Sequence, residues 1–159
     1  MKYALKILPW KRALVVSIAT LALLIVFSFY GLYTNQFYFF KFQNYIFPLA
    51  ALVHFAFLYV LWFKIKEEEI ADPQMRNLEY VLYAILLVYI YKLIDTVLIV
   101  VGASKFVDHT IPETFKPIGI LIMVLYTLLI VLTVLTIIYR KKYVGGYKFD
   151  DMNQVDNWD

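Results

Sequence analysis

The chain has 159 residues, a formal net charge of +3 and no cysteine. Apolar residues make up 63% of it and charged residues only 17%, whereas a soluble domain has roughly 45–50% apolar residues. There is too little polar surface to cover a water-soluble globule, so we expect lipid to surround most of the chain. The lack of cysteine excludes disulfides, thiolate metal sites and cysteine nucleophiles.

Four segments are long and apolar enough to cross a bilayer. A hydrocarbon core about 30 Å thick requires roughly 20 apolar residues in a helix. Backbone groups in lipid must be hydrogen-bonded within their own segment, so each segment is predicted to be helical. None shows the in–out alternation of a barrel strand. The predicted spans are residues 13–33, 42–63, 78–101 and 118–139.

These spans predict an all-α integral membrane four-helix bundle with antiparallel, up-down-up-down topology. Residues 1–142 would form the transmembrane domain, and residues 143–159 an acidic C-terminal tail. The sequence ADPQ, at residues 71–74, is expected to break the chain between the second and third helices. Pro117 is expected in the first turn of the fourth helix, with Thr114 capping its start and Gly102 closing the third helix.

The basic residues predict the orientation of the bundle. Eleven Lys or Arg residues fall on the side that carries both termini, and three on the other side: Lys41, Lys105 and Lys116. Positively charged flanks stay inside, so both termini are predicted to be cytoplasmic. The first apolar stretch is too long for the core of a cleaved signal peptide, and we expect it to be retained. Rich usage of Ile, Tyr, Phe and Lys suggests an AT-rich bacterial genome, and hence the bacterial cytoplasmic (inner) membrane.

Aromatic residues gather in the connection between the first two spans. Nine Phe or Tyr residues occur between Tyr30 and Phe47. One interpretation is an interfacial belt at headgroup level; the other is a docking surface for a neighbouring membrane protein, because large rings dominate buried contacts. The candidate docking residues are Phe37, Tyr38, Phe39, Phe40 and Phe42, with Trp158 in the tail as a further candidate.

Three ionisable residues are predicted to lie at membrane depth: His54 in the second span, and Lys92 and Asp95 in the third. A lone Lys or Asp at the bilayer centre costs about 2.5–3.5 kcal/mol, so these side chains should face protein or water. Lys92 and Asp95 are three residues apart and share a helix face, and His54 could face them from the neighbouring helix. The cluster could be a polar clasp, a path for protons or ions, or a ligand or quinone pocket with Tyr89, Tyr91 and His54 as donors.

Enzyme motifs are missing from the sequence, which has no glycine-rich phosphate loop, nucleophile elbow or HExxH. We therefore expect no enzyme activity, no cofactor, no metal and no nucleic-acid partner. The expected function is that of an accessory or scaffolding subunit of a larger membrane complex (respiratory, transport or secretion), with lipid and other membrane subunits as partners. The alternatives are a small ion or proton transporter or channel, expected to be a homo-oligomer and to use Lys92, Asp95 and His54, and a quinone- or lipid-binding protein.

Overall fold

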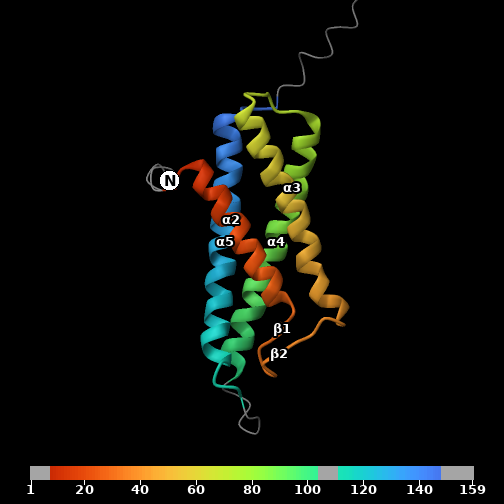
Figure 1. The fold of residues 1–159 in the computed structure, drawn as a ribbon, viewed down its shortest axis with the longest axis vertical. Helices are drawn as coiled ribbons and strands as arrows, with labels where there is room; N and C mark the ends of the chain where they lie inside the picture. The colour runs from red at the N-terminus through yellow and green to blue at the C-terminus, as the bar shows by residue number, and fades with distance from the viewer. Residues whose placement is uncertain (1–7, 104–110, 148–159) are drawn as a thin grey trace, which may run out of the picture.

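A computed structural model describes residues 8–103 and 111–147, and they form a bundle of four long helices (Figure 1). The helices are α2 (Trp10–Ser28, 19 residues), α3 (Ile46–Lys66, 21 residues), α4 (Pro73–Gly102, 30 residues) and α5 (Phe115–Tyr143, 29 residues). Each is long and apolar enough to cross a membrane. The predicted all-α four-helix membrane bundle is confirmed.

The helices run up and down in chain order, so each packs against its neighbours in the sequence, and α2 also packs against α5. The most extensive interface joins α4 to α5. At one end of the bundle, here named the terminal end, α2 and α4 begin and α3 and α5 end (Figure 1). At the opposite end, here named the hairpin end, a short β-hairpin connects α2 to α3.

The first helix is shorter than predicted. It ends at Ser28 rather than at residue 33, because the chain turns back on itself as β1 (Tyr30–Gly31) and β2 (Gln36–Phe37), with Tyr30 opposite Phe37. Glycine is required at position 31, since a Cβ there would lie 2.6 Å from a ring carbon of Tyr38. Asn35 closes the turn at φ 52°, a left-handed conformation that asparagine tolerates. A 3₁₀ turn (Phe42–Tyr45) then leads into α3.

Capping explains the start of α4. Pro73 occupies the first helical position, where its missing N–H costs nothing. The Asp72 carboxylate accepts a hydrogen bond of 2.7 Å from the Met75 backbone N–H. At α5, Pro117 lies in the first turn as predicted, but Thr114 makes no side-chain cap, so the capping prediction there was wrong. Gly102 is the last residue of α4, but the C-cap is Ala103 in a right-handed conformation, so the predicted glycine cap was wrong.

Lys64 ties the end of α3 to the connection that follows it. Its ammonium lies 2.8 Å from Asp72 and 2.7 Å from Glu69. The hydrogen bond from Lys64, together with the backbone bond from Met75, holds the pKa of Asp72 below its ordinary value of 3.8.

Replacing Asp72 by Ala should lower the free energy of unfolding by about 1 kcal/mol, the usual cost of losing a helix N-cap. Because the folded-state pKa is lowered, this stabilisation is fully present above about pH 4 and is lost as the pH falls through the folded-state value. Thermal unfolding of both proteins in detergent, from pH 7 downward, measures the difference. A difference that stays constant to the lowest pH would contradict this account.

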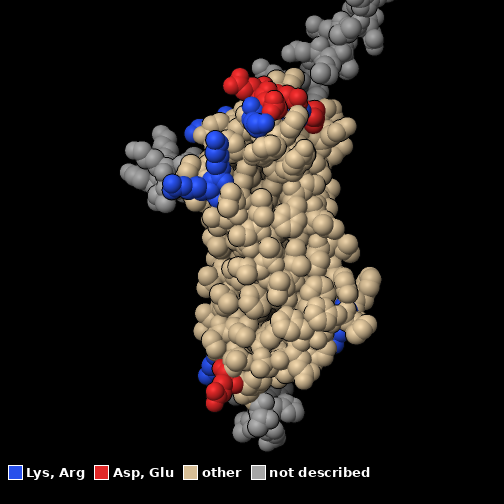
Figure 2. Space-filling view, viewed as in Figure 1, with Lys and Arg blue, Asp and Glu red and all other residues tan. Residues whose placement is uncertain are grey.

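The core of the bundle is apolar, and so is its outer surface. The most deeply buried side chains include Leu21, Leu24, Phe47, Phe57, Leu61, Leu82, Tyr89 and Leu129. Large apolar side chains also face outward along the helices, among them Val15, Leu52, Leu87, Leu98 and Val124. Figure 2 shows the result, a wide uncharged band between charged groups at the two ends. A surface of this kind is suited to hydrocarbon rather than water.

Candidate functional site

A polar cavity opens near the hairpin end of the bundle, with a volume of about 220 Å³. It lies between the connection from α2 to α3 and the helices α4 and α5. Lys92, Asp95 and Thr96 line it from α4, and Tyr126 lines it from α5. The other polar side chains in its wall are those of Ser28, Tyr30, Gln43 and Asn44, and its apolar wall includes Phe27, Leu32, Phe47 and Ile122.

Lys92 and Asp95 are both half-buried in this cavity. Within residues 8–103 and 111–147, no ion pair joins the ammonium of Lys92 to the carboxylate of Asp95 at 4.0 Å or less, and no hydrogen bond involves either charged group. The two residues therefore share a face, as their spacing predicts, and present two opposite charges to one cavity.

His54 lies elsewhere. It is fully buried, and its Nδ1 is 3.1 Å from the hydroxyl of Tyr89. The buried ring of Phe47 packs against both Tyr89 and Tyr126, at 5.6 Å between ring centroids in each case. Phe47 and Tyr126 also line the cavity, so the aromatic cluster that surrounds Tyr89 forms part of the cavity wall.

The three ionisable residues predicted to form one cluster thus occupy two places. The structure brings Lys92 and Asp95 together in the cavity and puts His54 beside Tyr89 instead of opposite them. Tyr91, considered as a third donor for a pocket, is exposed on the outer surface. The Nε2 atom of His54 is buried and has no hydrogen-bond partner in the described part of the chain.

A second polar site, near the terminal end, was not predicted. Glu79 of α4 and Arg140 of α5 form an ion pair, with 2.6 Å between Oε2 and Nε, and each side chain is only 4% exposed. Arg140 Nη2 also donates to Glu79 Oε1 at 2.8 Å. The Tyr83 hydroxyl donates to the same Oε1 at 2.8 Å. A charge pair this deeply buried is sustained only when its remaining polar atoms find partners.

The start of the C-terminal tail completes this second site. The Tyr147 hydroxyl donates to Glu79 Oε2 at 2.6 Å, and Arg140 Nη1 donates to the Gly145 carbonyl at 2.9 Å. The Arg140 guanidinium also lies 4.3 Å from the centre of the Tyr147 ring. Partial burial, and then the hydrogen bond to Glu79, raises the pKa of Tyr147, which keeps the hydroxyl a donor. We name Glu79, Tyr83, Arg140 and Tyr147 the carboxylate network.

A signal for this network was present in the sequence. Glu79 stands just inside the predicted third span, and Arg140 just beyond the predicted fourth. Antiparallel neighbours place those two positions at the same depth. As one of the eleven basic residues that predict the orientation, Arg140 gives no separate sign that it pairs with Glu79.

The aromatic connection forms an ordered surface at the hairpin end. Phe29 packs against Phe39 and Tyr45, and the Tyr45 hydroxyl donates to the Phe39 carbonyl at 2.8 Å. Four of the candidate docking residues are nevertheless uncovered. Phe37 and Phe39 are 51% and 55% exposed, Phe42 is 82% exposed, and Phe40 is fully exposed. We name these four residues the phenylalanine patch.

The other two candidate docking residues do not join the patch. Tyr38 is half-buried, and the ammonium of Lys41 lies 4.5 Å from the centre of its ring. Trp158, with residues 148–159 of the tail, lies outside the described residues.

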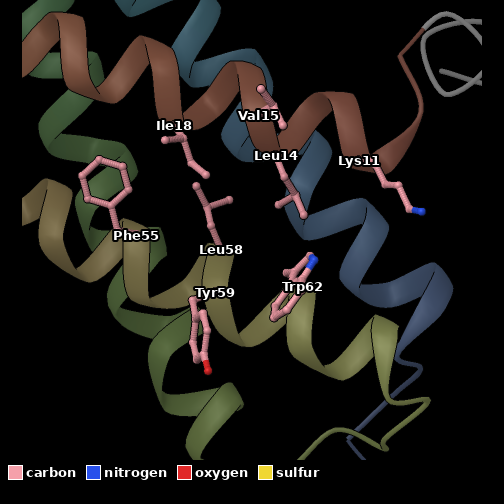
Figure 3. Close-up of a pocket in the computed structure, with 8 residues that line it drawn as sticks. All are labelled: Lys11, Leu14, Val15, Ile18, Phe55, Leu58, Tyr59 and Trp62. Atoms are coloured by element: carbon pink, nitrogen blue, oxygen red, sulfur yellow. The ribbon is translucent and has the colours of Figure 1, made fainter.

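An apolar groove runs between α2 and α3 toward the terminal end, with a volume of about 590 Å³ (Figure 3). Leu14 and Ile18 of α2 face Phe55 and Leu58 of α3 across it, and Lys11 lies at one end of the row (Figure 3). A lipid chain has the chemistry to fill such a groove.

In the described part of the chain, no group of three or more His, Cys, Asp or Glu side chains converges. Comparisons with protein-family models, with curated proteins and with solved structures find no match for this chain. Fold and composition alone therefore define its class, an integral membrane protein built as a four-helix bundle.

Proposed function

We propose that this protein is a non-enzymatic accessory or scaffolding subunit of a larger membrane complex, with both termini in the cytoplasm of a bacterium. The observation that carries the proposal is the phenylalanine patch, which leaves four large apolar rings uncovered at one end of an ordered hairpin. Unlike Trp and Tyr, Phe has no polar group that would favour the headgroup region. An interfacial belt therefore explains poorly why these four positions are Phe. Exposed aromatic rings are typical of protein–protein interfaces.

The interior of the bundle supports a structural role over transport. Several buried hydroxyls that a proton relay could use donate instead to carbonyls of their own helices. Ser17 donates to Ala13 at 2.7 Å, and Thr133 donates to Leu129 at 2.7 Å. The transporter and the quinone-binding protein remain alternative hypotheses.

The test is the size of the native assembly. After extraction in a mild detergent, the chain should migrate on native gels with one or more other membrane proteins at fixed stoichiometry. The double variant Phe40→Gln/Phe42→Gln should release it, because each ring at the centre of an interface contributes about 2 kcal/mol or more.

Tyr80→Gln is the matched control, since Tyr80 is an exposed aromatic residue of α4 far from the patch, and it should leave the assembly intact. A wild-type chain that runs alone, or an assembly that survives the double substitution, would refute the proposal.

A further inference from the structure

The polar cavity contains two opposite charges, those of Lys92 and Asp95, to which the described part of the chain gives no ion pair or hydrogen bond. The Asp95 carboxylate does interact electrostatically with Tyr126, which shares the cavity wall. Elsewhere the described chain pairs opposite charges closely, as the buried pair of Glu79 with Arg140 and the partly exposed pair of Lys64 with Asp72 show. Lys92 and Asp95 have no such pairing within residues 8–103 and 111–147, although both lie in a membrane-spanning helix. A charge at membrane depth requires compensation, and the cavity is where a ligand could supply it.

The walls of the cavity define what would fit. The Asn44 carboxamide donates one N–H to the Tyr38 carbonyl at 2.7 Å. Its second N–H and its oxygen can still hydrogen-bond to a ligand. The Thr96 hydroxyl donates to the Lys92 carbonyl at 2.8 Å, so its oxygen can still accept. Phe47 and Ile122 contribute apolar surface to the wall. A matching ligand therefore carries two charged groups for Lys92 and Asp95 and further polar atoms that can hydrogen-bond to Asn44 and Thr96.

From this arrangement, we propose that the cavity binds a small zwitterion, with its oxyanion at Lys92 and its ammonium at Asp95. One zwitterion would neutralise both side chains at once, which a simple anion or cation could not do. A water molecule occupies about 30 Å³ of liquid, so a cavity of about 220 Å³ holds roughly seven water-sized groups. That is the size of a small amino acid or of a phosphoethanolamine headgroup. This inference goes beyond the proposed function and does not depend on it.

The test uses the purified full-length chain in nanodiscs made only of phosphatidylglycerol. The probes are glycine, L-serine and O-phosphoethanolamine, and the readouts are the melting temperature and equilibrium binding of radiolabelled probe. At least one zwitterion should bind saturably and raise the melting temperature, since a ligand that binds only the folded state stabilises it. Acetate and ethylammonium, added together at the same concentration, should do much less. Equal effects from the separate ions would overturn the proposal.

Variants locate the site. Lys92→Met and Asp95→Asn should each weaken binding about tenfold or more. Lys116 and Glu113 are exposed at the same end of the bundle, so Lys116→Met and Glu113→Gln are matched controls that should bind as the wild type does. If a charge variant fails to fold, Ile122→Phe fills the cavity without altering either charge and should still abolish binding. Wild-type affinity in Lys92→Met, Asp95→Asn or Ile122→Phe would refute the assignment.

A second set of nanodiscs distinguishes a free ligand from a lipid headgroup. If phosphatidylethanolamine supplies the zwitterion, adding it to the discs should raise the melting temperature of the wild type but not of Asp95→Asn. If the ligand is free, the soluble probes bind in phosphatidylglycerol discs and the added lipid changes nothing. No effect of any zwitterion in either disc would overturn the proposal. The Phe40→Gln/Phe42→Gln chain should bind normally, so failure here and failure of the subunit proposal are separable.

Discussion

Replacing Arg140 by Met should lower the free energy of unfolding by about 3–5 kcal/mol, because the change leaves the buried carboxylate of Glu79 without its cationic partner. The change also frees the Gly145 carbonyl and removes the cation from the face of Tyr147, so the start of the tail should detach. Equilibrium unfolding in mixed micelles measures the first effect. Increased proteolysis near residue 147 reports the second.

The double variant Glu79→Leu/Arg140→Met separates the cost of an unpaired charge from the value of the pair. Removing both charges should destabilise the protein less than removing Arg140 alone, since no buried charge is then left uncompensated. Lys141→Met is the control, because Lys141 is the exposed neighbour and its loss should change stability by about 0.5 kcal/mol or less. A double variant as unstable as the single one, or less stable, would show that the pair is not the source of the effect.

Replacing Phe47 by Ala should also cost about 3–5 kcal/mol, the usual price of truncating a fully buried aromatic ring. The ring contacts both Tyr89 and Tyr126, and its removal leaves a cavity where three aromatic side chains now pack. Phe42→Ala is a close control, with the same substitution five positions earlier at a residue that is 82% exposed. Thermal unfolding of the two variants in the same detergent makes the comparison. Similar losses in both would contradict the described packing.

Hydropathy was sufficient to predict the fold, because a run of about 20 apolar residues has few alternatives in lipid. The exit of the chain from the first span was harder to predict. Tyr30 is apolar enough to extend a helix, whereas Gly31 is a poor helix former, and the folded hairpin leaves no room for a side chain at position 31 beside the Tyr38 ring. Gly31 and Tyr38 come close only after the turn has formed, so the sequence alone does not show that they meet.

The candidate sites were predicted less completely, because the sequence does not show how each helix is rotated about its own axis. Spacing along one helix placed Lys92 and Asp95 on a common face, which needs no knowledge of neighbouring helices. The direction of His54 depends on how α3 is turned against α4, and this is set by the packing of Phe47 and Tyr89. The pairing of Arg140 was not predicted because the rule that assigns orientation counts a basic residue at the end of a span in the same way whether it is solvated or paired.

The unequal lengths of the helices should affect the surrounding membrane. At 1.5 Å per residue, α2 is about 28 Å long, whereas α4 and α5 are about 45 and 44 Å long. A hydrocarbon layer of about 30 Å matches α2, but α4 and α5 must tilt, protrude into the headgroups or thicken the layer beside them. The terminal ends of both longer helices carry charged residues, Arg76 in α4 and Arg140, Lys141 and Lys142 in α5, so these ends should extend into the headgroup region while α2 stays within the hydrocarbon thickness.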